Sequence, residues 1–195
     1  VTKSVAGLNL TGKYIIKSCE ISPKSGAKQT VELPADNIKL TNISSDITVT
    51  LELVAYDHIV TIKAGGSSET HYVKGDKDVL SGKSIGYTVS GRKLITEATG
   101  NACNINVNGT KTAVTVTNIT ADTTVTVTLV AYDHIVTVNA TGDYSKTYYV
   151  KDSNDVLTGS AITYKATGQN VISGVTILPK AAKETHDATT ATITD

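Results

Sequence analysis

An aspartate followed by a histidine occurs twice in the same setting, as Asp57-His58 and as Asp133-His134, each inside the octapeptide LVAYDHIV. A carboxylate beside an imidazole can prepare the histidine for general-base chemistry. Adjacent residues of a β-strand point to opposite faces, however, so the ring and the carboxylate of each pair would not meet. No Ser or Cys nucleophile recurs at a shared position of the two settings. We therefore expect a contact at a junction, and the sequence predicts no catalytic residue and no enzyme activity.

The two cysteines, Cys19 and Cys103, lie in no Cys-x-x-Cys or Cys/His pattern that would bind a metal ion. They occupy non-equivalent places in the sequence, so two unpaired thiols and one disulfide both remain open. We predict no metal-binding residue, no cofactor-binding residue and no cofactor.

The nine tyrosines are the only aromatic residues of the chain. Exposed tyrosines can stack on sugars, but in a core without Phe or Trp they also supply large apolar surfaces while the hydroxyl reaches the edge. We expect the second role for the three pairs at equivalent positions, which are Tyr56 and Tyr132, Tyr72 and Tyr149, and Tyr87 and Tyr164.

Two further polar patterns favour structure or composition over chemistry. Asp46 and Asp122 precede alternating segments in SSD and TAD contexts, which are typical of turns. Five Asn-x-Ser/Thr triplets are weak evidence for glycosylation in a chain with 32 threonines; they begin at Asn9, Asn42, Asn108, Asn118 and Asn139.

The octapeptide belongs to a longer duplication that organises the whole chain. Residues 41–62 match residues 117–138 at a spacing of 76, and residues 72–82 match residues 149–159. A repeated unit of about 76 residues explains both matches. We predict a partial first repeat at residues 1–56, a complete second repeat at 57–132, and a shortened third repeat at 133–195.

The repeated unit is expected to be all-β. Val, Ile and Thr abound, and alternation is clearest where Val125, Val127 and Leu129 would face a core between threonines that face water. We predict small Ig-like β-sandwich or β-grasp-like units. For the second repeat the expected strands are residues 58–63, 71–74, 85–90, 104–107, 113–118 and 123–131, with a hairpin at Asn108-Gly109 because both residues tolerate positive φ.

Composition excludes two classes of partner. The 18 basic and 18 acidic side chains cancel, and no basic stripe with interleaved aromatic residues is present, which argues against nucleic acid. No apolar run is long enough for membrane insertion.

The octapeptide would then connect two units. LVAY ends one unit and HIV begins the next, so a short linker of fixed sequence predicts a stiff junction.

Residues 57–132 resemble the divergent internalin-type B repeats and related β-rich repeats of bacterial surface proteins. The likeness lies in an opening HIVTI strand, the segment GKSIGYTVSG, a VNG hairpin, and the closing phrase VTNITADTTVTVT; the third repeat has a weaker echo of that closing phrase in DATTATITD at 187–195. The resemblance implies an extracellular or cell-surface spacer or adhesive module. Similar repeats also occur in phage tails and capsids, which keeps a virion surface protein as an alternative.

The leading hypothesis is a non-enzymatic structural protein, a surface rod or fibre component of tandem β repeats. A virion protein and a carbohydrate-binding adhesive module are the alternatives. The first repeat lacks counterparts of residues 58–63 and 71–74, and the third is shorter by about one hairpin in its second half. Exposed sheet edges invite pairing, so we predict head-to-tail self-association into a homopolymer. A host-surface glycan or protein is a second candidate partner.

Overall fold

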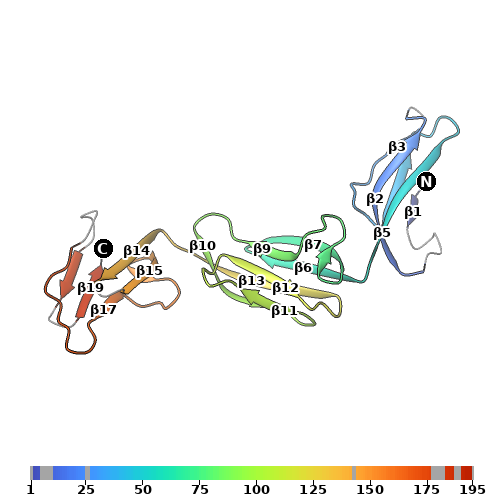
Figure 1. Cartoon of the computed structure of the whole chain (residues 1–195). Helices are drawn as coiled ribbons and strands as arrows, with labels where there is room; N and C mark the ends of the chain where they lie inside the picture. The colour runs from blue at the N-terminus through green and yellow to red at the C-terminus, as the bar shows by residue number, and fades with distance from the viewer. Residues whose placement is uncertain are drawn as a thin grey trace. The chain divides into compact units, whose positions relative to one another are not determined.

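The computed structural model describes residues 2–4, 11–24, 27–141, 144–176, 183–186 and 190–194. Within these residues the protein is all-β and contains no helix, so no helix there could cross a membrane. By its internal contacts the chain divides into two compact units, residues 1–88 with 97–128 and residues 89–96 with 129–195. Figure 1 labels many of the strands.

The second repeat contains two sheets. Its strands are β6 (His58–Ala64), β7 (Ser67–Lys74), β8 (Lys77–Asp78), β9 (Ile85–Thr88), β10 (Lys93–Thr99), β11 (Asn104–Val107), β12 (Ala113–Thr117) and β13 (Thr123–Ala131). The larger sheet has the order β10-β13-β6-β7-β8 and the smaller one the order β11-β12-β9. Strands β13 and β6 pair in parallel, with Val125 opposite Ile62 and Val127 opposite Ala64.

Alternation along β13 decides which of its faces is buried. Val125 and Val127 are 0% and 3% exposed, whereas Thr124 and Thr126 are exposed. The prediction for this strand is confirmed for both valines, while Leu129 is only partly buried.

Side chains from both sheets meet in one core. A Cβ atom added to Gly100 would lie 3.1 Å from Ile105 of β11 and 3.2 Å from Val125 of β13. The segment KGDKDVLSG, which would have held a short helix in a β-grasp layout, forms β8 and a turn instead. Of the two predicted architectures, the arrangement of the second repeat is therefore that of a β-sandwich.

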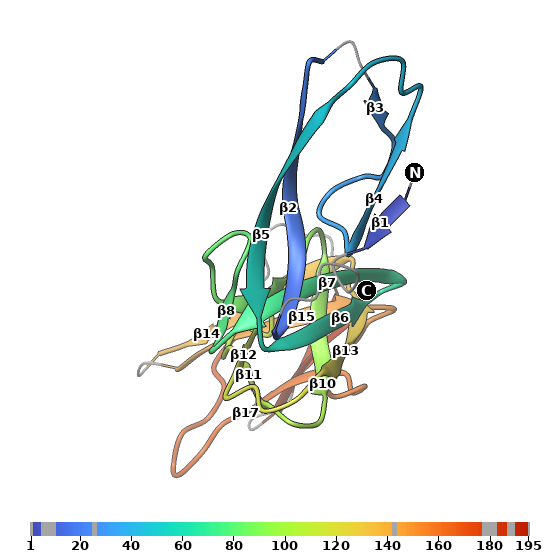
Figure 2. The ribbon, with the colours of Figure 1, turned by 90° about the vertical axis from the view of Figure 1, so that its right-hand side faces the viewer.

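The first repeat reproduces the later strands of the second. It contains β1 (Thr2–Ser4), β2 (Lys13–Ser22), β3 (Lys28–Gln29), β4 (Asn37–Thr41) and β5 (Thr48–Tyr56). The sheet β1-β4-β3 has the pairing of β9-β12-β11, and the pair β2-β5 corresponds to β10-β13 (Figure 2). Among the described residues of this repeat, no strand corresponds to β6, β7 or β8.

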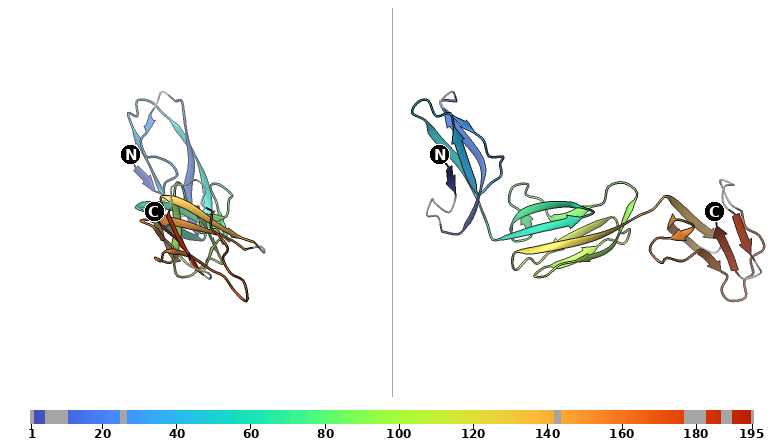
Figure 3. Two further views of the ribbon diagram at one scale, coloured as in Figure 1. Left: turned by 90° about the vertical axis from the view of Figure 1, so that its left-hand side faces the viewer. Right: turned by 180° about the vertical axis from the view of Figure 1, so that it is seen from behind.

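The third repeat reproduces the earlier strands of the second. Its sheet β14-β15-β16 consists of His134–Ala140, Tyr144–Lys151 and Asn154–Asp155 and corresponds to β6-β7-β8. Its second sheet has the order β17-β19-β18, formed by Ile162–Lys165, Thr190–Thr194 and Lys183–His186 (Figure 3).

The prediction that residues 187–195 echo the closing strand was wrong. Ile193 of β19 lies opposite Ile162, as Val116 of β12 lies opposite the equivalent Ile85. Strand β19 is therefore the counterpart of β12, and Asp187 lies outside the described residues. The sequence alone does not distinguish a counterpart of β12 from a counterpart of β13, because both strands alternate threonine with apolar residues.

All six strands predicted for the second repeat exist, with changes of length at β6, β7, β9 and β12, but β8 and β10 were missed. Strand β10 escaped because its buried residues are the neighbours Leu94 and Ile95, which break a period of two.

The hairpin between β11 and β12 is present, but its predicted cause was wrong. Positive φ occurs at Lys111, with a value of 59°, and not at Asn108 or Gly109. The loop is instead held by the Asn108 side chain, whose Oδ1 accepts hydrogen bonds from the backbone N–H groups of Thr112 (2.8 Å) and Ala113 (3.0 Å).

Candidate functional site

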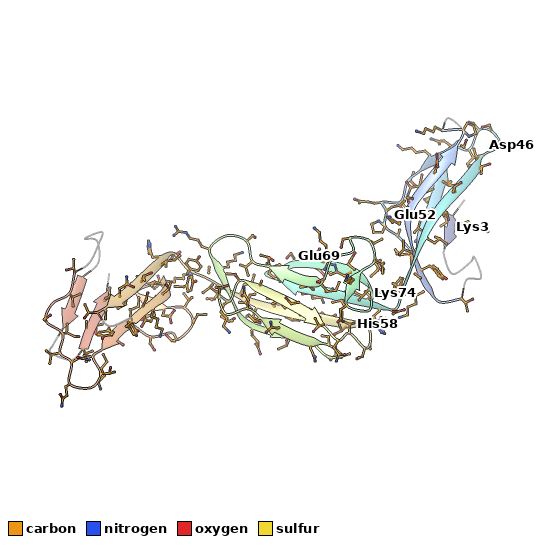
Figure 4. The ribbon with its side chains drawn as sticks, in the orientation of Figure 1. Lys3, Asp46, Glu52, His58, Glu69 and Lys74 are labelled. Atoms are coloured by element: carbon orange, nitrogen blue, oxygen red, sulfur yellow. The ribbon has the colours of Figure 1, made fainter. Side chains whose placement is uncertain are left out.

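The two Asp-His pairs lie where β6 and β14 begin, and His58 is labelled in Figure 4. The His58 ring is partly buried, and its Nδ1 lies 3.8 Å from Oδ1 of Asp122, which is too far for a hydrogen bond. His134 is exposed. The acid nearest in sequence is thus not the acid nearest to the His58 ring, in keeping with the expectation that each pair would not meet.

Asp122 was expected to form a turn, and this was wrong. Its Oδ1 accepts a hydrogen bond of 2.9 Å from the backbone N–H of Ile59, at the start of β6. This bond is the main reason why the pKa of Asp122 lies below its ordinary value. The carboxylate therefore links the beginning of β6 to the residue before β13. Both Asp122 and its counterpart Asp46, which is labelled in Figure 4, are exposed.

A histidine–aspartate pair joins β7 to the end of β8. The sequence analysis does not predict this pair. His71 Nδ1 lies 3.0 Å from Oδ2 of Asp78, and Asp78 is 6% exposed. Oδ1 of the same carboxylate accepts hydrogen bonds from the backbone N–H groups of Leu80 (2.9 Å) and Ser81 (2.7 Å). Burial alone would raise the pKa of Asp78, but the bonds from Ser81, His71 and Leu80 together hold it below the ordinary value.

The other ring nitrogen of His71 has no hydrogen-bond partner. Nε2 is buried, and the nearest acidic oxygen, Oε1 of Glu69, lies 3.7 Å away (Figure 4). An aspartate that orients a histidine is also half of a nucleophile-activating arrangement. Among the described residues no hydroxyl or thiol hydrogen-bonds to Nε2. The geometry supports a brace between the β7–β8 hairpin and the turn that follows it.

The third repeat has the aspartate of this brace without the histidine. Asp155 is 5% exposed and accepts hydrogen bonds from the backbone N–H of Leu157 (3.4 Å) and from Oγ1 of Thr158 (3.0 Å). The position of His71 is taken by Tyr148. The histidine is thus specific to the second repeat.

The tyrosines of both octapeptides make the same contact. The Tyr56 ring packs edge-to-face on Tyr72 with the centroids 5.0 Å apart at 66°, and Tyr132 packs on Tyr149 at 4.9 Å and 62°. All four side chains are partly buried, and burial raises the pKa of Tyr72. The rings serve as packing surfaces, as the sequence predicts.

The aspartates of both octapeptides also repeat one hydrogen bond. The backbone N–H of Asp57 donates to the carbonyl of Val73 (2.7 Å), and that of Asp133 donates to the carbonyl of Val150 (2.8 Å). Each octapeptide is therefore bonded to the second strand of the repeat that follows it.

The two cysteines are unpaired, and three asparagines of the Asn-x-Ser/Thr triplets are exposed. Cys19 and Cys103 are free thiols, which decides between the two open alternatives. Asn42 and Asn118 have positive φ of 54° and 51° at equivalent exposed positions, as befits loop residues. Asn139 is exposed and accepts a hydrogen bond from Ser145, and Asn9 lies outside the described residues.

A groove of about 390 Å³ opens in the third repeat beside β14. It is lined by residues 137–141 and 170–176 and, from the facing sheet, by Tyr164, Ala191 and Ile193. The polar groups that line the groove are mainly hydroxyl, amide and backbone groups. The groove can therefore hold a polypeptide segment more readily than a charged small molecule.

No protein-family model, curated protein or solved structure matches the chain. In the part of the chain that the structure describes, no three His, Cys, Asp or Glu residues lie close enough together to hold a metal ion.

Proposed function

We propose that this protein is a non-enzymatic structural component built of tandem β repeats and displayed at an extracellular or cell surface. The observation that carries the proposal is the duplicated junction. Two copies of one octapeptide make the same ring contact and the same backbone hydrogen bond to the following hairpin.

A flexible linker needs no particular sequence, because it makes no contacts. An edge-to-face aromatic pair contributes about 0.5–1.5 kcal/mol beyond the area that it buries. Together with a backbone hydrogen bond of normal length, such a pair holds each octapeptide to the hairpin that follows it. A structural role that depends on defined spacing between repeats would explain why both junctions keep these contacts.

The resemblance of residues 57–132 to internalin-type repeats supports the surface location, and the same resemblance leaves a virion surface as the alternative. Head-to-tail association with further copies stays a prediction. Glycan binding has less support, since six of the nine tyrosines pack on one another in pairs.

The junction is tested by replacing Tyr132 with alanine. Loss of the Tyr149 contact is expected to raise the rate of limited proteolysis at residues 132–134 by about tenfold, because roughly 1.4 kcal/mol of local stability is removed. Cleavage sites are identified by mass spectrometry.

Tyr164→Ala is the matched control. It removes a ring pair of the same geometry, with Tyr144 at 5.0 Å and 63°, inside the third repeat and away from the octapeptide. The control should leave cleavage at residues 132–134 unchanged. Equal cleavage in the wild type and in Tyr132→Ala would remove the basis of the proposal.

The absence of catalysis is tested with the double variant His58→Ala, His134→Ala. In the part of the chain that the structure describes, neither ring forms a hydrogen bond with an acid that could activate it, so the free energy of unfolding should change by less than about 1 kcal/mol. A hydrolase screen should find nothing in either protein. Activity in the intact chain that disappears in the double variant would contradict a structural role.

A further inference from the structure

Asn108 is the only asparagine of the chain that is followed by glycine. An asparagine can react with its own backbone, because the N atom of the next residue can attack the carbonyl carbon of the side chain. Glycine in the next position favours this reaction, since it has no Cβ atom to hinder the approach and its backbone rotates freely. Every other asparagine precedes Ala, Asp, Ile, Leu or Val. The sequence therefore contains one preferred position for spontaneous deamidation.

The hairpin between β11 and β12 holds this side chain at both of its polar atoms. Oδ1 accepts the backbone N–H groups of Thr112 (2.8 Å) and Ala113 (3.0 Å), and Nδ2 donates to Oγ1 of Thr112 (3.2 Å). The backbone N–H of Asn108 donates to the carbonyl of Ala113, and its carbonyl accepts the N–H of Lys111, both at 3.0 Å. The carboxamide is thus bonded across the loop.

The shape of the loop does not require glycine at position 109. Gly109 has no positive φ, and a Cβ atom added to it would meet no other atom within 4 Å. Alanine therefore fits the folded loop at this position, while its side chain would hinder attack by the backbone N atom. The fold and the reaction place different demands on residue 109, so they can be tested separately.

We propose that Asn108 is a deamidation site of this protein and that the β11–β12 hairpin keeps it unreacted until the hairpin opens. Ring closure brings Cγ of Asn108 onto the N atom of Gly109, so the hydrogen bonds of Oδ1 and Nδ2 must break first. The reaction rate then follows the fraction of molecules in which the hairpin is open. This inference goes beyond the proposed structural function, because it assigns a covalent reaction with water to one residue.

The reaction consumes only water. The N atom of Gly109 gives its proton to the solvent and forms a bond to Cγ of Asn108. The bond between Cγ and Nδ2 breaks, and ammonia leaves after taking up one proton from the solvent. Water then opens the resulting succinimide ring at one of its two carbonyl carbons. One opening gives aspartate, and the other gives isoaspartate, in which the backbone runs through Cγ and is longer by one CH2 group.

The two products differ in their effect on the hairpin. An aspartate at position 108 can still accept the N–H groups of Thr112 and Ala113. An isoaspartate lengthens the loop just after β11, which is the first strand of the sheet β11-β12-β9 and pairs with β12 from Asn104 to Val107. Isoaspartate is therefore expected to loosen β11 from β12, whereas aspartate leaves the pairing intact.

The test compares the full 195-residue chain folded in buffer with the same chain unfolded in guanidinium chloride, both at mildly alkaline pH in isotopically labelled water. Peptide mapping by mass spectrometry gives the rate at each asparagine and separates aspartate from isoaspartate. In the unfolded chain Asn108 should react faster than every other asparagine. In the folded chain its rate should fall at least about tenfold, because the three side-chain hydrogen bonds must open first.

Two variants separate the chemistry from the protection. Gly109→Ala should slow the reaction at Asn108 at least about tenfold in the unfolded chain, where folding plays no part. Thr112→Val removes the acceptor of the Nδ2 bond and should raise the rate in the folded chain by about two- to fivefold. Thr115→Val is the matched control for the second variant, since Thr115 is exposed on the same strand and lies opposite Asn106. This control should leave the rate unchanged.

Several results would overturn the proposal. Equal rates at Asn108 in the folded and the unfolded chain would show that the hairpin does not protect it. A faster reaction in the folded chain would show that the two N–H donors activate the side-chain carbonyl instead. An earlier reaction at another asparagine, or an unchanged rate in unfolded Gly109→Ala, would refute the choice of site. Equal effects of Thr112→Val and Thr115→Val would refute the role of the Nδ2 bond.

Discussion

Replacing Asp78 with alanine is expected to lower the free energy of unfolding of the first compact unit by about 3–5 kcal/mol. The carboxylate is buried and satisfies three donors, which are the backbone N–H groups of Leu80 and Ser81 and the ring of His71. Without it, all three donors lose their partner at a partly buried site. Denaturant unfolding followed at the amides of β6 and β7 measures the change.

Asp155→Ala is the matched control in the third repeat. Asp155 is equally buried, but its two bonds are 3.4 Å and 3.0 Å long and no histidine is involved. Its loss should cost about 1–2 kcal/mol. If both substitutions had the same effect, the histidine and the shorter bonds would add nothing, and the brace would not be a feature of the second repeat.

The same carboxylate predicts an acid dependence with a definite sign. Its pKa in the folded protein lies below the ordinary value of 3.8, because the bonds from Ser81, His71 and Leu80 outweigh the effect of burial. The unfolded state therefore takes up the proton first as the pH falls. Stabilisation by Asp78 is complete above about pH 5 and is lost as the pH drops through the folded pKa. The stability gap between the wild type and Asp78→Asn should accordingly narrow between pH 5 and pH 2.

The fold could be predicted where burial follows a period of two. Strand β13 satisfies this condition, because its threonines and valines alternate strictly and only one face meets the core. Strand β10 does not, since Leu94 and Ile95 are both buried. Alternation also does not identify a strand's partner, so the sequence predicts a closing strand where the structure has β19 paired with β17.

The candidate contacts depend on register between strands, which a sequence shows only indirectly. His71 and Asp78 are seven residues apart, and they meet because Val73 pairs with Asp78 across the β7–β8 hairpin. Asp122 and Ile59 meet because β13 and β6 run in parallel. The duplicated octapeptide is the one pattern in the sequence from which a contact is predicted, namely the contact at the junction between repeats.

Ile62→Ala is expected to lower the free energy of unfolding by about 2–5 kcal/mol. Ile62 is 2% exposed and lies opposite Val125 in the parallel pair, so truncation leaves a cavity between two strands that are held on both sides. The central position of β6 prevents the neighbouring strands from closing the cavity. Unfolding in urea, followed at the amides of β13, gives the magnitude.

Val138→Ala is the matched substitution at the free edge. Val138 is the counterpart of Ile62, but no described strand lies on its open side, so the smaller side chain removes a contact without enclosing a cavity. The expected cost is under about 1 kcal/mol. Unfolding in urea, followed at the amides of β15, gives the magnitude. A cost as large as that of Ile62→Ala would mean that Val138 is as well enclosed as its counterpart in β6.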